Sequence, residues 1–296
     1  MNPLFLYTKN IVLSLLLTFG CLNSILTFAQ NQKIIIAIEK SPYGMLFTDI
    51  FVNGLPVKAI IDFGDPNRFQ LSDTLLKQFQ IPVKETNKIA IDDIGRKYKV
   101  FDGIIDSVRI GNCTFKNEPF SSSPDEMKLV GKQINTEFHA VVGWGFFSDY
   151  YITMNYRKKE IIISSTSETP GNVCFLSSLI NESSYLIMQS KINGIDANLI
   201  LDTGSPLTLL DSSFYNKNNF FSTDTQVFHL KDTIPLKTIS TTFGNNSVAI
   251  SYLIYDLTPT LFLAVGIIGG DIFDKYEIYI EPKEKMIYFS KEKLSN

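Results

Sequence analysis

The chain repeats part of itself, and this duplication constrains its fold more than any other feature of the sequence. Residues 52–66, VNGLPVKAIIDFGDP, align without a gap with residues 192–206, INGIDANLILDTGSP. Asp62 then falls on Asp202, 140 positions later, and the neighbouring glycine and proline coincide as well. Such a repeat within 296 residues indicates two homologous halves, each large enough for a core of its own.

A second pair of segments supports the same division. Residues 143–164, GWGFFSDYYITMNYRKKEIIIS, align with residues 269–290, GGDIFDKYEIYIEPKEKMIYFS, 126 positions later. Each copy has the pattern of an alternating strand, a charged turn and another strand. Because the separation falls from 140 to 126 positions, the first half is 14 residues longer between the two landmarks. The polar stretch 121–138 is predicted to hold this surplus.

The sequence therefore predicts two lobes joined by a short linker. The first lobe spans residues 30–164, the second spans residues 173–296, and the polar segment STSETPGN, residues 165–172, is the expected linker. Short runs rich in Ile, Val, Phe and Tyr favour strands, so the expected fold class is all-β or mostly β, with about one helix per lobe. LSDTLLKQF is the clearest helix candidate, with Ser72 or Asp73 as its N-terminal cap.

The first 29 residues have the pattern of a secretory signal peptide. Lys9 precedes an apolar run without charge up to residue 32, and TFA before Gln30 matches a small-residue cleavage site after Ala29. The mature chain is expected to begin near Gln30 and to be exported, to the periplasm or the medium. Two alternatives stay open: an uncleaved N-terminal anchor, since about eighteen apolar residues can span a bilayer, and a lipoprotein lipidated at Cys21. No later segment is long and apolar enough to span a membrane.

Composition argues against several classes of function. The 27 basic and 30 acidic residues nearly balance, so no nucleic-acid-binding face is predicted. Apart from the signal segment the chain has two cysteines, Cys113 and Cys174, which allow at most one disulfide, and no Cys/His cluster has metal-site spacing. The two histidines, His139 and His229, lie far from each other and from any candidate nucleophile in the sequence. No Ser/His/Asp or Cys/His triad, metal site or cofactor is therefore predicted.

The repeated motif resembles the catalytic loops of aspartic proteases of the pepsin and retropepsin type. In the second half the motif is LILDTGS followed by VGIIGGDIF, and in the first half it is AIIDFGD followed by AVVGWGFF. The resemblance covers most of residues 43–290, and IIGGDIFDKYEIYI is especially similar to retropepsin-like domains of bacterial exported proteins. It implies a bilobal acid-protease-like fold, with two β-barrel-like lobes and a cleft between them. It also implies a monomer, because both halves of the catalytic pair lie in one chain.

The resemblance assigns the chemistry to Asp62 and Asp202, which are expected to face each other at the bottom of the cleft, roughly 3 Å apart. Two carboxyl groups that close share one proton. The ionised one takes a proton from water and the protonated one donates to the carbonyl of a peptide or protein substrate, so neither a metal nor another cofactor is needed. The expected supporting residues are Gly64, Asp65, Thr203, Gly204 and Ser205.

The environment of Asp202 is expected to favour its charged form. Gly204 lets the backbone turn tightly and brings peptide N–H groups close to the carboxylate. The hydroxyl of Ser205 can add another hydrogen bond. These contacts are expected to keep Asp202 ionised at low pH.

The first loop departs from the family pattern. It has Asp-Phe-Gly-Asp where the family has Thr or Ser in the second position and Ser or Thr in the fourth. Thr203 is expected to make the cross-loop hydroxyl contacts of the family, whereas Phe63 cannot, and the Phe63 ring is expected to point into the core. Asp65 adds a negative charge that should raise an apparent pKa of the pair. Its side chain is expected to lie near Asp62 or to turn outward to water.

Three functions remain open on the sequence alone: an exported aspartic endopeptidase, a catalytically inactive two-lobed module that binds peptides, and an accessory domain whose partners are not revealed. The divergent first loop is the feature that separates the first two. The segment DDIGRKY, residues 92–98, is either the tip of a substrate-covering hairpin or an ordinary surface hairpin. Trp144 is expected in the core rather than in a ligand platform.

Overall fold

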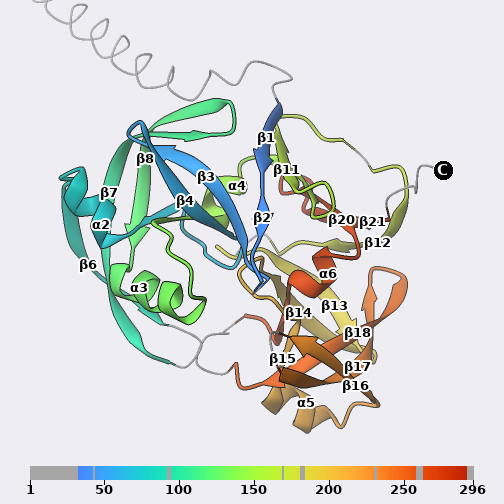
Figure 1. Cartoon of the computed structure of the whole chain (residues 1–296). Helices are drawn as coiled ribbons and strands as arrows, with labels where there is room; N and C mark the ends of the chain where they lie inside the picture. The colour runs from blue at the N-terminus through green and yellow to red at the C-terminus, as the bar shows by residue number, and fades with distance from the viewer. Residues whose placement is uncertain are drawn as a thin grey trace, which may run out of the picture.

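The protein is mostly β-structure and has two lobes, as Figure 1 of the computed structural model shows. Each lobe is built on its own sheet, and a third sheet takes strands from both halves of the chain. The predicted fold class, mostly β and bilobal, is confirmed. The described residues are 33–42, 44–91, 95–168, 170–180, 184–229, 232–257 and 263–291.

The predicted signal peptide, the alternative anchor and Cys21 all fall within residues 1–32, outside the described residues. Within the described ranges, no helix combines the length and apolar character that a membrane crossing requires.

The first lobe contains an eight-stranded sheet. Six strands follow the order β5-β9-β4-β3-β7-β6, while β2 pairs with β3 and β8 pairs with β7. Strand β9 runs parallel to β4 on one side and antiparallel to β5 on the other. The strands are β2 (Glu39–Lys40), β3 (Leu46–Val52), β4 (Leu55–Asp62), β5 (Phe69–Leu71), β6 (Val83–Ile91), β7 (Lys97–Ile110), β8 (Cys113–Ser122) and β9 (Ala140–Gly143).

The second lobe contains a seven-stranded sheet with the same central arrangement. Its order is β13-β14-β19-β15-β18-β17-β16, and β19 runs parallel to β14 and antiparallel to β15. The duplication seen in the sequence is therefore also a duplication of topology. The strands are β13 (Ile187–Ile192), β14 (Ile195–Leu201), β15 (Leu209–Asp211), β16 (Thr223–His229), β17 (Asp232–Phe243), β18 (Asn246–Tyr255) and β19 (Gly266–Ile268).

The third sheet holds the two hairpins of the second repeated segment side by side. Its order is β1-β11-β10-β20-β21-β12, and β10 of the first half pairs antiparallel with β20 of the second. Because both halves contribute strands to it, the exact border between the lobes stays a prediction. The described residues 165–168 and 170–172 carry no helix or strand, which fits a linker. The strands are β1 (Lys33–Ala37), β10 (Tyr151–Asn155), β11 (Glu160–Ser164), β12 (Val173–Ser178), β20 (Glu277–Glu281) and β21 (Met286–Ser290).

The helices are short and lie at the ends of strands. Ser72 caps the predicted helix, since Leu75 N donates to Ser72 Oγ at 3.4 Å. Helix α3 occupies most of the polar stretch 121–138, where the extra residues of the first half were predicted. The helices are α2 (Asp73–Gln78), α3 (Pro124–Gln133), α4 (Trp144–Phe147), α5 (Ser212–Asn218) and α6 (Gly270–Phe273).

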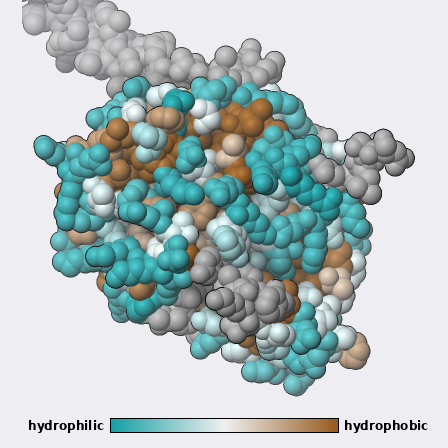
Figure 2. All heavy atoms as spheres, in the orientation of Figure 1, coloured by the Kyte–Doolittle hydropathy of each residue, from teal (hydrophilic) through white to brown (hydrophobic). Residues whose placement is uncertain are grey.

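One apolar core runs through both lobes and the shared sheet, and a smaller cluster lies between α3 and the first lobe's sheet. Strand β1 alternates exposed and buried residues, as a strand with one face on a core should. Figure 2 shows a mostly hydrophilic face, with apolar side chains gathered in its upper part over β8 and β1. The smaller cluster is Met45, Phe47, Ile60, Met127, Ile134, Phe138 and Val141.

Candidate active site

Equivalent loops carry Asp62 and Asp202. Strand β4 ends on Asp62, and β14 ends on Leu201, directly before Asp202. In each lobe the chain then turns and returns as β5 or β15, and β9 or β19 lies between the outgoing and returning strands. Asp62 is opposite Gly143 in the parallel pair, and Asp202 N donates to Ile268 O at 3.0 Å.

The second repeated segment of each half begins with glycine, Gly143 or Gly269, because the Asp-containing loop of the same half passes very close to it. A Cβ atom on Gly143 would lie 2.2 Å from Asn67 O, and one on Gly269 would lie 2.3 Å from Leu207 O. Both distances are far below van der Waals contact, so any other residue would push the loop away. The apolar-apolar-Gly pattern is thus a packing requirement of the Asp-containing loop.

The two loops face each other across the boundary between the lobes. A Cβ on Gly64 would lie 2.5 Å from Asp202 Cγ, and one on Gly204 would lie 2.8 Å from both carboxyl oxygens of Asp62. Each carboxyl group is also held by its own loop: Gly64 N donates to Asp62 Oδ1 at 2.9 Å and Gly204 N donates to Asp202 Oδ1 at 2.7 Å. Each carboxyl group thus lies over the glycine of the opposite loop, close enough for the charge of Asp202 to act on Asp62. The structure therefore brings Asp62 and Asp202 together, whereas their separation of roughly 3 Å stays a prediction.

Burial raises the pKa of both carboxyl groups. Each residue keeps some solvent exposure, although protein surrounds its carboxyl group on most sides. For Asp62, burial and the negative charges of Asp202 and Asp65 raise the pKa well above its usual value. For Asp202, burial also raises the pKa, but hydrogen bonds from Asp62 and from the backbone N–H groups of Gly204, Ser205 and Gly64 oppose it.

Both pKa values are thus raised, and more of the opposing hydrogen bonds act on Asp202 than on Asp62. The sequence-based expectation that hydrogen bonds keep Asp202 ionised at low pH is wrong, because the cost of burial exceeds their effect and its pKa is raised. The expected role of the Ser205 hydroxyl is also wrong. That hydroxyl donates to Leu207 O at 2.7 Å, and only the backbone N–H of Ser205 acts on Asp202.

The hydroxyl of Thr203 links the two loops, and the side chain of Phe63 makes no such link, as predicted. The buried Thr203 Oγ1 donates to Ile61 O at 2.8 Å and accepts from Phe63 N at 3.0 Å. The Phe63 ring is fully buried and packs on Phe147 and Trp144, with centroid distances of 4.9 and 5.6 Å. Trp144 is a core residue, as expected.

Asp65 lies near Asp62, the first of its two predicted positions. It is buried, and its charge contributes to the raised pKa of Asp62. Asp65 Oδ1 accepts from Asn67 N and Nδ2 at 2.9 and 2.7 Å, and Oδ2 accepts from Gln70 Nε2 at 2.8 Å. Burial raises the pKa of Asp65 itself, and these three hydrogen bonds oppose that rise.

Sequence reasoning missed Asn67 and Gln70, the residues that stabilise the third carboxylate. Gln70 also accepts from Ser123 N and Oγ at 3.2 and 3.3 Å, which ties the first loop to the start of α3. Their only sequence signal is an amide side chain close after Asp65. This signal does not predict whether the amide group points toward the Asp65 carboxylate.

The remaining predicted features have mixed outcomes. Strands β6 and β7 form the hairpin expected around DDIGRKY, with Ile91 opposite Lys97, but residues 92–94 at its tip are outside the described residues. Cys113 and Cys174 are free thiols, so the possible disulfide does not form. Across the described ranges, no group of three or more His, Cys, Asp and Glu residues is arranged to hold a metal ion.

His139 lies next to a serine hydroxyl in the folded chain. Its Nδ1 lies 3.2 Å from Ser72 Oγ, because β9 and the start of α2 are neighbours in the fold. Ser72 Oγ is at the same time the cap of α2.

Comparisons with known proteins agree with this fold at a distance. No family model and no curated protein matches the sequence. Among solved structures, the chain is similar to basic 7S globulin from soybean, with a TM-score of 0.53 and 10% identity over 89% of this chain and 96% of that one. The class that the architecture defines is thus a bilobal, pepsin-like fold. At 10% identity the likeness concerns the fold alone.

Proposed function

We propose that the protein is an aspartic endopeptidase of the retropepsin-like kind, which hydrolyses peptide bonds with a water molecule activated between Asp62 and Asp202. One observation carries the proposal. Two loops of equivalent design bring two carboxyl groups together, and each lies over the glycine of the opposite loop.

The unequal surroundings of the two carboxyl groups define their roles. Asp202 receives more backbone hydrogen bonds and is the ionised member, so it takes a proton from the water as general base. Asp62, beside the charge of Asp65, holds the proton and donates it to the carbonyl oxygen of the scissile peptide. The attack yields a tetrahedral intermediate, and a proton then passes to the leaving amine.

The proposed mechanism predicts when the pair is active. It needs one proton on Asp62 and a charge on Asp202. Activity is therefore present below the pKa of Asp62 and is lost as the pH rises through that value. Because burial raises both pKa values, the active range lies higher than for two exposed aspartates.

The proposal also covers the substrate, the oligomeric state, the export of the chain and the residues that support the catalytic pair. The substrate is a peptide or protein, the enzyme works as a monomer, and neither a metal nor a cofactor takes part. The chain is exported, with a mature start near Gln30. The first lobe ends at residue 164 and the second begins at residue 173. Residues Gly64, Asp65, Thr203, Gly204 and Ser205 support the catalytic pair.

A second candidate is the inactive peptide-binding module, and Phe63 is the observation that favours it. With phenylalanine at this position, only one of the two facing loops supplies a hydroxyl to the other. The loops then depend on the single Thr203 link to keep the carboxyl groups aligned.

A peptide-library digest between about pH 3 and pH 7 separates the candidates. We expect the wild-type protein to cleave peptides and Asp202→Asn and Asp62→Asn to lose about 10²–10⁴-fold in rate. Asp196→Asn, at an exposed site of the second lobe, is the matched control and should keep full activity. Thermal unfolding of each variant verifies that it is folded.

The outcome that rejects the endopeptidase is equally clear. Cleavage that survives in Asp202→Asn, rises steadily to alkaline pH or stops with a metal chelator excludes the carboxyl pair as its source. Peptide binding without cleavage by the wild-type protein favours the inactive module.

A further inference from the structure

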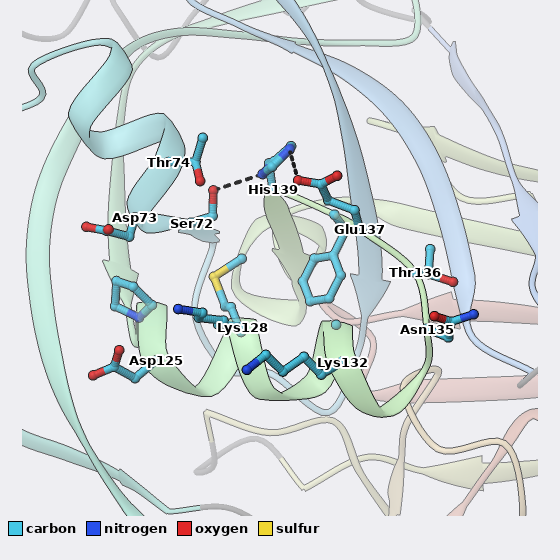
Figure 3. A pocket seen from close by; sticks show the side chains of 14 residues that line it. Ser72, Asp73, Thr74, Asp125, Lys128, Lys132, Asn135, Thr136, Glu137 and His139 are labelled. Atoms are coloured by element: carbon cyan, nitrogen blue, oxygen red, sulfur yellow. Dashed lines mark hydrogen bonds and ion pairs between the residues drawn. The ribbon is translucent and has the colours of Figure 1, made fainter.

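A pocket of about 530 Å³ lies between α2 and α3 on the first lobe (Figure 3). Its walls are the start of α2, one side of α3 and the segment that leads from α3 into β9. Neither Asp62 nor Asp202 lines it, so it is separate from the proposed active site. It is built largely from the stretch 121–138, the part in which the first half of the chain is longer than the second.

Two lysines give one wall of this pocket a positive charge. Lys128 and Lys132 are four residues apart on α3, so they lie on the same side of the helix, and both line the pocket. Among the described side chains, neither ammonium group has an ion-pair partner within 4.0 Å. Like charges at this spacing repel each other and weaken the helix. An anion bound by both would remove that repulsion.

The carboxylates of the pocket are engaged elsewhere or are locally stabilised. Asp73 forms an ion pair with Lys77, one turn further along α2. Glu137 lies 3.4 Å from His139 Nε2. Asp125 is in the first turn of α3, where the helix dipole favours a negative charge. Lys128 and Lys132 are thus the two ammonium groups that line the pocket, and no described carboxylate of the pocket is paired with either of them.

The rest of the pocket combines an apolar floor with neutral hydrogen-bonding groups. Met127 and Phe138 line it and belong to the small apolar cluster beneath α3. In Figure 3, Ser72 and His139 form the wall across from α3, joined by their hydrogen bond. The volume falls within the roughly 300–1,000 Å³ that is usual for small-molecule sites. An apolar surface beside two cations matches a ligand with both an apolar body and an acidic group.

We propose that this pocket binds a small organic anion, in which a carboxylate or phosphate group on an apolar body contacts Lys128 and Lys132. The body rests on Met127 and Phe138. This site is additional to the proposed peptidase activity and does not depend on it.

Nuclear magnetic resonance titration of the full chain tests the site, with the amide signals of Gly131 and Phe138 as reporters. The probes are phenyl phosphate, benzoate, inorganic phosphate and phenol. We expect saturable shifts with phenyl phosphate or benzoate, at least tenfold weaker binding of inorganic phosphate and phenol, and weaker binding at higher salt. The tighter of the two aromatic acids identifies the acidic group. Absence of saturation by both acids, or equal binding of phenol, overturns the proposal.

Substitutions then test whether Lys128 and Lys132 are the groups that bind the anion. Lys128→Gln combined with Lys132→Gln should weaken binding of the better acid at least tenfold. Lys84→Gln combined with Lys116→Gln removes the same charge from exposed strand positions outside the pocket and should leave the affinity unchanged. All four positions are exposed, so the fold should survive, and thermal unfolding verifies this. Equal affinity in both double variants would exclude the lysines as the binding groups.

Discussion

The two aspartate loops share one backbone design and differ in the side chains that complete it. In both, the glycine two residues after the aspartate donates to its carboxyl group, at 2.9 Å in the first loop and 2.7 Å in the second. In both, a glycine of the second landmark lets the loop pass within contact distance. The second loop adds the Thr203 hydroxyl, which crosses to the first, whereas Phe63 of the first loop packs into its own lobe.

The fourth position of the loops shows the same contrast. Ser205 donates to Leu207 O, while Asp65 accepts from Asn67 N, so each side chain bonds to the backbone two residues on, with opposite hydrogen-bond roles. Only the first loop thereby acquires an additional buried charge. Glycine is required where another part of the chain passes against the backbone. The neighbouring positions accept any side chain that packs well and satisfies its hydrogen bonds. Three substitutions test how these side-chain differences affect stability and the pH range of activity.

The largest effect on stability is expected for Phe63→Thr, which gives the first loop the residue of the second. Loss of the ring removes the packing of Trp144 and Phe147 and leaves a cavity, so the free energy of unfolding should fall by about 3 kcal/mol. Urea denaturation measures it. Phe221→Thr, at an exposed site, is the control and should change little. A variant as stable as the wild type would mean that the new hydroxyl fully replaces the aromatic contact.

A smaller loss is expected for Thr203→Val, which removes the one hydroxyl link between the loops while keeping the side-chain shape. Ile61 O and Phe63 N each lose a buried hydrogen bond, which should cost about 2 kcal/mol of unfolding free energy. Thr225→Val, at an exposed strand position, is the matched control. Equal stability of the two variants in urea would show that the link between the loops contributes nothing.

The smallest effect is expected for Asp65→Ser, which makes the fourth position of the first loop like that of the second. Removing the Asp65 charge lowers the pKa of Asp62, whose protonated form the proposed reaction requires. The high-pH limit of kcat/KM should therefore move to lower pH. Asp106→Ser removes an exposed charge and should leave the profile in place. A shift toward higher pH would contradict the assignment of the proton to Asp62.

Much of this architecture is predictable from the sequence because it depends on local patterns that occur twice. The two Asp-containing loops, the hairpins that follow, the helix capped by Ser72 and the buried Phe63 all follow from apolar periodicity, glycine and capping residues. The pairing of Asp62 with Asp202 follows from the duplication, since two equivalent loops meet when their lobes pack about a twofold axis.

Folding fixed the features that depend on residues distant in the chain. It paired the hairpin β10–β11 with the hairpin β20–β21 in one sheet and brought the amide groups of Asn67 and Gln70 to the Asp65 carboxylate. It also brought His139 to Ser72 and formed the pocket between α2 and α3. It also built the surroundings that raise the pKa of both aspartates. A sequence pattern identifies the two acids, but the pKa of each depends on burial and on charges and N–H groups that only the folded chain assembles around it.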